Sequence, residues 1–302
     1  AKVSFPWSMI DKITPRPDAS VKKMLEDAGF TDTESIVTSK NTYVAPFVNA
    51  EEAQYLVIEN AFPNGRPALE NAGVMFTSRE TVEKVERMKV CTCLNPLHTA
   101  LAVYGCLLGY TKISDEMKDA DLVKLVEIIG YKEGLPVVTD PGILSPKKFI
   151  DEVLQIRVPN PFMPDTPQRI ACDTSQKLSI RFGETIKEYM ASSELDVKSL
   201  KFIPMVQAGW CRYLLGVDDE LNAFTVSPDP MYEELAGKLA GVKVGESCDV
   251  HAVLAPILSN AKIFGVDLYE AGLGEYVESI FAELIAGKGA VRETLKRHLA
   301  EA

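Results

Sequence analysis

A repeating helical pattern covers most of this chain. From about Ser78 onward, apolar residues recur at intervals of three and four, as at Leu122, Leu125, Val126 and Ile129. That spacing places the apolar side chains on one face of an α-helix. The pattern predicts a mostly α-helical domain from residue 79 to residue 302. Within it, helices are expected at about 146–156, 175–192, 198–215, 230–242, 247–258, 277–284 and 290–300.

The first 78 residues have a mixed pattern. Residues 18–28 are predicted to form a short helix closed by Gly29, because glycine commonly follows the last helical turn. The β-branched and aromatic residues of 41–48 and 54–59 predict two short strands. The turn-forming residues of 62–67 predict a loop after them. We therefore expect a small α/β portion ahead of the helical domain.

Charge and hydropathy narrow the class of partner. The 302 residues carry a formal net charge of −11, which would repel a phosphate backbone. We therefore expect no nucleic-acid partner. The most apolar stretch, residues 99–110, is shorter than the roughly 20 residues of a membrane helix, so no membrane partner is expected either.

Cysteine and glycine patterns bear on compartment and cofactors. The six cysteines include no Cys-x-x-Cys pair and are predicted to be reduced thiols, which indicates a cytoplasmic protein. No metal site is expected: the three histidines lie far apart in the sequence, and Cys91, Cys93 and His98 lack a fourth ligand at zinc-like spacing. No Gly-x-Gly-x-x-Gly or Walker-type loop is present, so the sequence assigns no cofactor-binding residues.

One segment holds residue types that suit proton transfer. Lys89 lies near the end of a predicted helix, and Asn95 followed by Pro96 predicts the start of the next, with Asn as the cap. His98 then falls in the first turn on the side of Asn95, where the helix dipole disfavours a positive charge. From this pattern alone, a helix cap, a packed histidine and a solvated lysine remain the simpler interpretation.

Other charged residues also have simple structural interpretations. Arg169 and Lys177 are eight residues apart and are consistent with a solvated face. Asp11 is consistent with a surface turn. The pair Asp218 and Asp219 is predicted to cap a turn and face solvent.

The order of the motifs resembles the mannitol dehydrogenase (long-chain polyol dehydrogenase) family. Lys89, Asn95 and His98, running into a small-residue apolar helix, are similar to the family signature. Lys89 and Asn95 are separated by one residue more than in the family pattern, and we expect a local bulge to absorb it. Lys84 is the other lysine nearby. Residues 5–15, 58–67, 73–76, 165–177 and 208–214 also resemble family motifs and follow one another in the family's order.

The resemblance implies a catalytic site. In the family the lysine is the general acid/base, while the asparagine and histidine hold the reacting oxygen. A lysine whose pKa is lowered by burial exchanges the proton of a secondary alcohol near neutral pH, and neutral donors stabilise the partial oxyanion. The implied catalytic residues are Lys89, Asn95 and His98, and the implied substrate-binding residues are Arg169, Lys177 and Asp11, the last near the nicotinamide.

The resemblance also implies a two-domain parent enzyme that uses NAD or NADP. Residues 1–78 would be the C-terminal remnant of its Rossmann-type domain, whose Gly-rich loop binds the pyrophosphate. Residues 79–302 would be the helical substrate and catalytic domain, similar to the C-terminal domain of 6-phosphogluconate dehydrogenase. Without the nucleotide-binding half, we expect this chain alone to be inactive. By analogy with the family, it would be a monomer or a weak homo-oligomer.

The implied substrate is a small sugar acid or polyol. The resemblance is greatest to the uronate branch, the fructuronate reductases or mannonate oxidoreductases, which interconvert D-mannonate and D-fructuronate. Tagaturonate reductase and mannitol 2-dehydrogenase remain alternatives within the family. A non-catalytic helical fragment or binding module is the alternative from another class.

Overall fold

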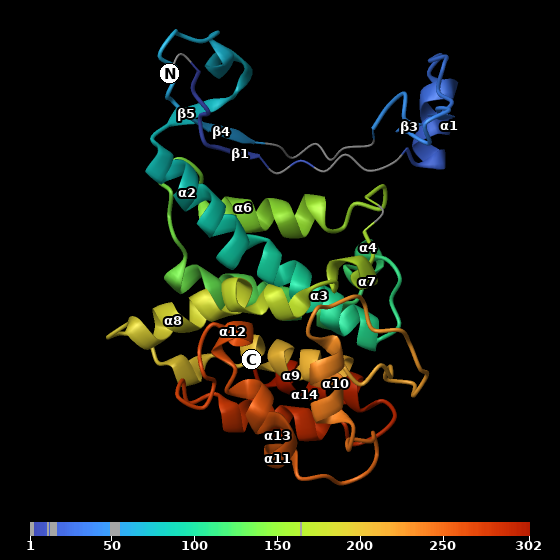
Figure 1. Cartoon of the computed structure of the whole chain (residues 1–302), viewed down its shortest axis with the longest axis vertical. Coiled ribbons are helices and arrows are strands. Elements are labelled where there is room, and N and C mark those ends of the chain that lie inside the picture. Colours follow the sequence, from blue (N-terminus) through green and yellow to red (C-terminus); the bar gives the residue numbers. More distant parts are fainter. Residues whose placement is uncertain (1–2, 11, 13–16, 49–54, 164) are drawn as a thin grey trace.

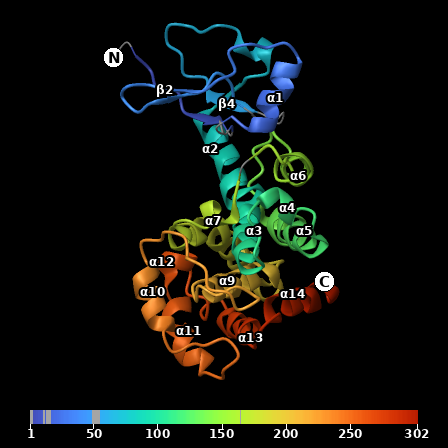
Figure 2. The ribbon, with the colours of Figure 1, turned by 90° about the vertical axis from the view of Figure 1, so that its right-hand side faces the viewer.

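The computed structural model describes residues 3–10, 12, 17–48, 55–163 and 165–302. It consists of a small N-terminal portion with short strands and a larger body of helices (Figure 1). Helix α2 (Arg79–Met88) runs from the sheet into the helical body and leads to α3 (Asn95–Leu107), as both views show (Figure 2). The predicted fold class, mostly α with a small mixed α/β portion at the N-terminus, is confirmed.

Three short strands form the main sheet. Strand β1 (Ser8–Ile10) pairs antiparallel with β4 (Leu56–Glu59), and β5 (Met75–Thr77) pairs parallel with β4 on its other side. The register sets Met9 opposite Val57, and both side chains are buried. They pack against side chains of α2, which gives the sheet a small core of its own, made of Met9, Val57, Val82 and Val85.

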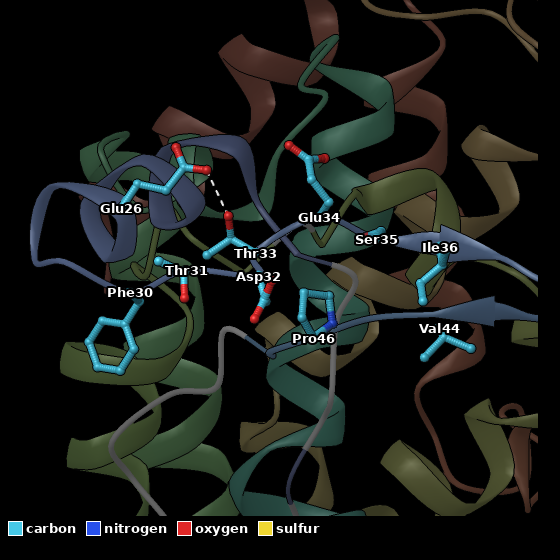
Figure 3. Close-up of a pocket in the computed structure, with 10 residues that line it drawn as sticks. All are labelled: Glu26, Phe30, Thr31, Asp32, Thr33, Glu34, Ser35, Ile36, Val44 and Pro46. Atoms are coloured by element: carbon cyan, nitrogen blue, oxygen red, sulfur yellow. Dashed lines mark hydrogen bonds between the residues drawn. The ribbon is translucent and has the colours of Figure 1, made fainter.

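A second unit contains α1 (Ala19–Asp27) and the hairpin of β2 (Ile36–Val37) and β3 (Tyr43–Val44), and it lies well to the side of the main sheet (Figure 1). The predicted helix start and end are found: Asp18 accepts hydrogen bonds from backbone N–H groups of the first turn, and Gly29 follows the helix with a φ of 89°. A cavity of about 560 Å³ lies between α1 and the hairpin (Figure 3).

The strand predictions were right in type and incomplete in number. The windows 41–48 and 54–59 contain β3 and β4, each shorter than predicted. Strands β1, β2 and β5 were missed, because two or three residues are too few to show an alternating pattern. The predicted domain boundary falls at the start of α2, whose Val82 and Val85 pack under the sheet.

The helical body is built around two buried helices. Helix α3 has eleven buried residues, and every residue of α9 (Phe202–Tyr213) is buried. A helix that is buried all round belongs to the core of its domain. The two helices pack together, and the Tyr104 hydroxyl donates to the Met205 carbonyl oxygen at 3.1 Å. Helix α13 (Gly274–Leu284) covers another face of α9.

The predicted helical windows all contain helices. The apolar positions of the windows near residues 122–129 and 277–284 are buried, as their spacing predicts. The longer helices outside those already named are α5 (Ala120–Glu127), α6 (Pro146–Glu152), α8 (Glu184–Ala191), α10 (Tyr232–Leu239), α11 (Val250–Leu258) and α14 (Ala290–Ala300). The short ones are α4 (Ile113–Glu116), α7 (Pro167–Ile170) and α12 (Ala261–Phe264).

Wide π-helical turns interrupt the helices at several points. The first, η2 (Lys89–Cys93), joins α2 to α3, and the Leu94 N–H donates to the Lys89 carbonyl oxygen at 3.1 Å. Because a π-turn accommodates one extra residue within a helix, η2 is the local bulge expected between Lys89 and Asn95. Others are η3 (Ile128–Gly134), η5 (Val153–Arg157) and η7 (Ser179–Gly183).

The turn η2 makes one continuous helical stretch of Arg79–Leu107. By length and composition this stretch is apolar enough to cross a membrane, and it is longer than the apolar run at residues 99–110. In the folded protein, 83% of the most apolar 18-residue segment of this stretch is buried. The stretch is therefore accounted for as the central helix of the fold.

The acidic pair at 218–219 differs from the prediction. Asp219 is buried, and its carboxylate accepts hydrogen bonds from the backbone N–H groups of Val291 at 2.8 Å and Arg292 at 3.0 Å. The expectation that both aspartates face solvent was wrong for Asp219. Its charge is needed at the N-terminus of α14, where Gly289 precedes the helix and offers no capping side chain.

Candidate active site

One cavity of about 250 Å³ brings together most of the predicted site residues. Lys89, Asn95, His98, Arg169 and Lys177 all line it, although they come from separate segments of the chain. Asp11 lies outside the described residues. The cavity is also lined by Leu94, Arg157, Asp165, Ile170 and Arg181.

The junction of α2, η2 and α3 positions the three predicted catalytic residues. Lys89 begins η2, Asn95 begins α3, and His98 lies one turn further along α3. Each of the three side chains is partly buried. Lys84, the alternative lysine, is 44% exposed, pairs with Glu80 at 2.7 Å and does not line the cavity.

Asn95 is not the cap of α3, which corrects the sequence interpretation. Leu94 occupies the cap position, Asn95 is the first helical residue, and no side chain caps this end. The reason is that α3 follows η2 directly, so the chain does not pass through the extended conformation that a capping residue adopts. The side chain of Asn95 lines the cavity instead.

A short hydrogen-bond relay braces the first turn of α3. The buried Thr99 hydroxyl donates to the Asn95 carbonyl oxygen at 2.9 Å. Nη1 of Arg181 donates to the same hydroxyl oxygen at 2.7 Å. Arg181 therefore contacts, through Thr99, the turn that carries Asn95 and His98, while its side chain also borders the cavity.

The cavity wall is strongly basic. Five lining side chains are lysine or arginine, and one, Asp165, is acidic. Burial lowers the pKa of Lys177, and the neighbouring charge of Arg181 lowers it further. Burial also lowers the pKa of Arg181 to about 10, so this guanidinium stays charged at neutral pH. A cavity with this excess of positive charge favours a negatively charged occupant.

The two predicted substrate-binding residues differ in their surroundings. Arg169, on α7, pairs with Asp165 one helical turn earlier, and its side chain is 56% exposed. Lys177 is partly buried, and its Nζ donates to the Cys172 carbonyl oxygen. Arg169 thus lies at the solvent side of the cavity, while Lys177 belongs to its wall.

Sequence reasoning missed two charged residues of the cavity, Arg157 and Arg181, while Asp165 begins the family block at 165–177 but was given no role. Arg181 follows Lys177 by four residues, a spacing that places two side chains on one helix face, so a signal was available. Arg157 ends the π-turn η5 and is 9% exposed. No periodic pattern indicates that a buried arginine lies there.

The cavity beside α1 has the opposite charge. Three of the residues that line it, Glu26, Asp32 and Glu34, are acidic, and none is lysine or arginine (Figure 3). The Thr33 hydroxyl donates to the Glu26 carboxylate at 2.7 Å within this cavity. None of the predicted site residues lines it, so it is not the candidate active site.

The part of the chain that the structure describes holds neither a cluster of metal-binding side chains nor an ionised thiol beside the site. No three His, Cys, Asp or Glu side chains there gather in a way that could hold a metal ion. Cys91 and Cys93, next to the site, are buried, and burial raises the pKa of Cys91 to about 11 and that of Cys93 to about 12. Such thiols stay protonated and are poor nucleophiles at neutral pH.

The described residues also lack the turn that binds a dinucleotide pyrophosphate. That turn is a Gly-rich connection between a strand and a following helix. Here β5 ends at Thr77, Ser78 caps α2 and α2 begins at Arg79, without a glycine between them. The connection between β5 and α2 therefore lacks the glycines of that turn.

Comparisons with known proteins show which family shares this fold. The mannitol dehydrogenase C-terminal domain model matches residues 81–284. The chain is 60% identical to the D-mannonate oxidoreductase of Thermotoga maritima, over 97% of this chain and 55% of that protein. It is 31% identical to the mannitol 2-dehydrogenase of Aspergillus niger, over 89% of this chain and 52% of that protein.

Solved structures show the same architecture. The Pseudomonas fluorescens mannitol 2-dehydrogenase, solved as a ternary complex with NAD and D-mannitol, matches with a TM-score of 0.75 at 26% identity. The match covers 99% of this chain and 55% of that one. The chain therefore belongs to the mannitol dehydrogenase family, which confirms the resemblance drawn from its motifs. It spans about half the length of the curated relatives it matches.

Proposed function

We propose that this chain supplies the acid–base and substrate-binding groups of an NAD(P)-dependent oxidoreductase that interconverts D-mannonate and D-fructuronate. The observation that carries the proposal is the cavity in which Lys89, Asn95 and His98 lie together within a basic wall. The similarity to a D-mannonate oxidoreductase over nearly the whole chain supports the choice of substrate. Among family reactions, a sugar acid fits a basic cavity better than an uncharged polyol.

The proposed chemistry at Lys89 is proton transfer. In the oxidation, the neutral Lys89 amine accepts the hydroxyl proton of the secondary alcohol; in the reduction, the ammonium returns a proton to the oxygen. Asn95 and His98 donate hydrogen bonds to that oxygen and stabilise its partial negative charge. A positioned acid–base group typically accelerates such a step by about 10²- to 10⁴-fold.

The hydride carrier in this proposal is NAD or NADP. Its support comes from the relatives, since one solved relative is a complex with NAD. The residues that the structure describes here do not provide a pyrophosphate site. We therefore propose that turnover requires a nucleotide-binding half, and that the 302-residue chain alone is inactive. The six free cysteines, four of them buried, are consistent with our further proposal of a cytoplasmic protein.

The test uses a protein of its relatives' length that carries this chain. NADH oxidation with D-fructuronate is expected, with lower kcat/KM for D-tagaturonate and D-fructose. The Lys89→Ala variant should lose at least about 100-fold in kcat/KM. Lys84→Ala is the matched control, because Lys84 lies outside the cavity and should retain the wild-type rate.

Two results would contradict the proposal. If no sugar acid is reduced, the proposed substrate class is wrong, and a non-catalytic role becomes the better explanation. If sugar acids are reduced and Lys89→Ala keeps the wild-type rate, the acid–base assignment is wrong while the substrate class stands.

A further inference from the structure

Arg181 lines the cavity, but the family motifs in the sequence give it no role. It lies in the π-turn η7 and is largely buried. A guanidinium has five N–H donors, and among the described residues Arg181 makes one hydrogen bond, from Nη1 to the Thr99 hydroxyl. Most of its donor capacity is therefore left for whatever occupies the cavity.

Arg181 also has no counter-charge in the described part of the protein. No carboxylate there forms an ion pair with it, and burial alone shifts its pKa. The charge of Arg181 lowers the pKa of the neighbouring Lys177, whereas Asp173 and Asp229 raise it. A buried charge without a partner is energetically costly, and a bound anion that pairs with it offsets that cost. Two neighbouring cations on one wall therefore create a place where an anion is stabilised.

Two other arginines, one fully buried and one in the same cavity, differ from Arg181 in this respect. Arg212 is fully buried, but its guanidinium donates to the carbonyl oxygens of Leu284, Val217 and Asp218. Its donors are thus used within the protein. Arg169 lines the same cavity as Arg181, but it already pairs with Asp165. Neither has a largely unpaired guanidinium against the cavity.

We propose that Arg181 is the specificity-determining residue that binds the carboxylate of the substrate. The inference rests on the proposed function of the same cavity. A planar guanidinium matches a carboxylate through two parallel hydrogen bonds, and Lys177 adds a second positive charge beside it. The carboxylate of a sugar acid does not react in the redox step, so it is available for binding. A polyol has no such group and leaves the charge of Arg181 unpaired.

Bracing is the structural alternative. Through Thr99, Arg181 supports the turn that carries Asn95 and His98. If bracing were its whole role, substitution would disturb the reacting oxygen and slow charged and neutral substrates alike. If Arg181 binds the carboxylate, the loss falls on sugar acids and is mainly an increase in KM.

The test compares Arg181→Gln, Arg181→Lys and the control Lys187→Gln in the relatives'-length protein. Lys187 is an exposed residue of α8 that pairs with Glu184 outside the cavity. For D-fructuronate, Arg181→Gln should raise KM by about 10- to 100-fold with a smaller change in kcat, as expected for a lost charged hydrogen bond. The KM of Arg181→Lys should lie between those of wild type and Arg181→Gln, since lysine keeps the positive charge but cannot form two parallel hydrogen bonds with a carboxylate. For neutral D-fructose, kcat/KM should change by less than about 3-fold, and Lys187→Gln should match wild type.

A binding measurement separates this inference from the proposed function. Calorimetry of D-mannonate and D-mannitol with the same proteins needs no turnover. If wild type fails to oxidise or reduce any sugar acid but binds D-mannonate, and Arg181→Gln weakens that binding alone, the proposed reaction fails and the carboxylate site stands. Equal losses for charged and neutral ligands would establish bracing and overturn the inference, as would an unchanged KM for D-fructuronate. Thermal melting checks folding, and Arg181→Lys decides the question if the Gln variant does not fold.

Discussion

At the scale of single residues, Glu116 combines an ionisable group with complete burial. It ends α4 and packs against Gly105 of α3, where any side chain would overlap its carboxyl group. Neither carboxyl oxygen has a hydrogen-bond partner among the described residues. Burial raises the pKa of Glu116 to about 9, and the nearby Asp119 charge raises it as well. The folded protein therefore holds Glu116 protonated at neutral pH.

The stability of the protein should fall as the pH rises because of this group. The folded-state pKa lies above the ordinary value of 4.5, so the contribution is complete below about pH 4.5 and is lost as the pH rises through about 9. Relative to Glu116→Gln, the wild-type free energy of unfolding should drop by up to about 1.4 kcal/mol per pH unit in this window. Urea unfolding at pH 6, 7 and 8 measures the difference.

Glu234→Gln is the control for the pH experiment. Glu234 lies on α10, is 57% exposed and pairs with Lys238. The free energy of unfolding of Glu234→Gln should therefore change with pH in the same way as that of wild type. Parallel curves for wild type and Glu116→Gln would show that Glu116 is ionised in the folded state, contrary to this expectation.

The candidate site shows what residue patterns predict and what they miss. Lys89, Asn95 and His98 were assigned because their order within one helix junction resembles the family signature, and one cavity brings them together. Arg157 and Arg181 reach the same cavity from π-turns far along the chain. The four-residue spacing from Lys177 is a local signal for Arg181. The burial of Arg157 depends on the packing of several helices, and local spacing carries no information about that packing.

At the scale of elements, long helices were predictable and their ends were less so. Helices such as α5 and α13 show a full apolar face, so their periodicity identifies them. Strands of two or three residues show no period, which is why β1, β2 and β5 were missed. Helix ends depend on tertiary partners. Asn95, a good capping residue, does not cap α3, while α14 is capped by Asp219 from a distant segment.

Asp219 gives a prediction at this scale. Replacing it with alanine leaves two N–H groups of the first turn of α14 without their acceptor. The free energy of unfolding should fall by about 1–3 kcal/mol, and Asp219→Asn should lose less because its amide oxygen still accepts. Urea denaturation followed by circular dichroism measures both changes. The neighbouring Glu220 is exposed and pairs with Lys288, so Glu220→Ala should stay within about 0.5 kcal/mol of wild type. Equal effects at both positions would show that the distant cap adds no stability.

At the scale of the whole molecule, helix α2 joins two cores of unequal size. The small core under the sheet has four buried residues, two of them from α2. The helical body contains most of the remaining buried apolar side chains. Each such side chain contributes roughly 1.5–3 kcal/mol, so the smaller core has far less to offset the loss of chain entropy on folding. The sheet portion should therefore open before the helical body does.

The two tryptophans report on the two cores separately. Trp7 precedes β1 and lies under the Arg79 guanidinium, 4.7 Å from it, whereas Trp210 is fully buried in α9. In Trp210→Phe, the fluorescence of Trp7 should change at a lower urea concentration than the circular dichroism of the same variant. In Trp7→Phe, the fluorescence of Trp210 should follow the circular dichroism.

Val57→Ala tests the same idea from the sheet side. Val57 is fully buried in the small core, and its truncation should lower the midpoint of the Trp7 transition while leaving that of Trp210 unchanged. A shared shift of both transitions would mean that α2 couples the two cores into one cooperative unit. In that case the predicted boundary between residues 78 and 79 would not separate two folding units. Unfolding of the sheet would expose Val82 and Val85 and thereby destabilise α2 and the helical body.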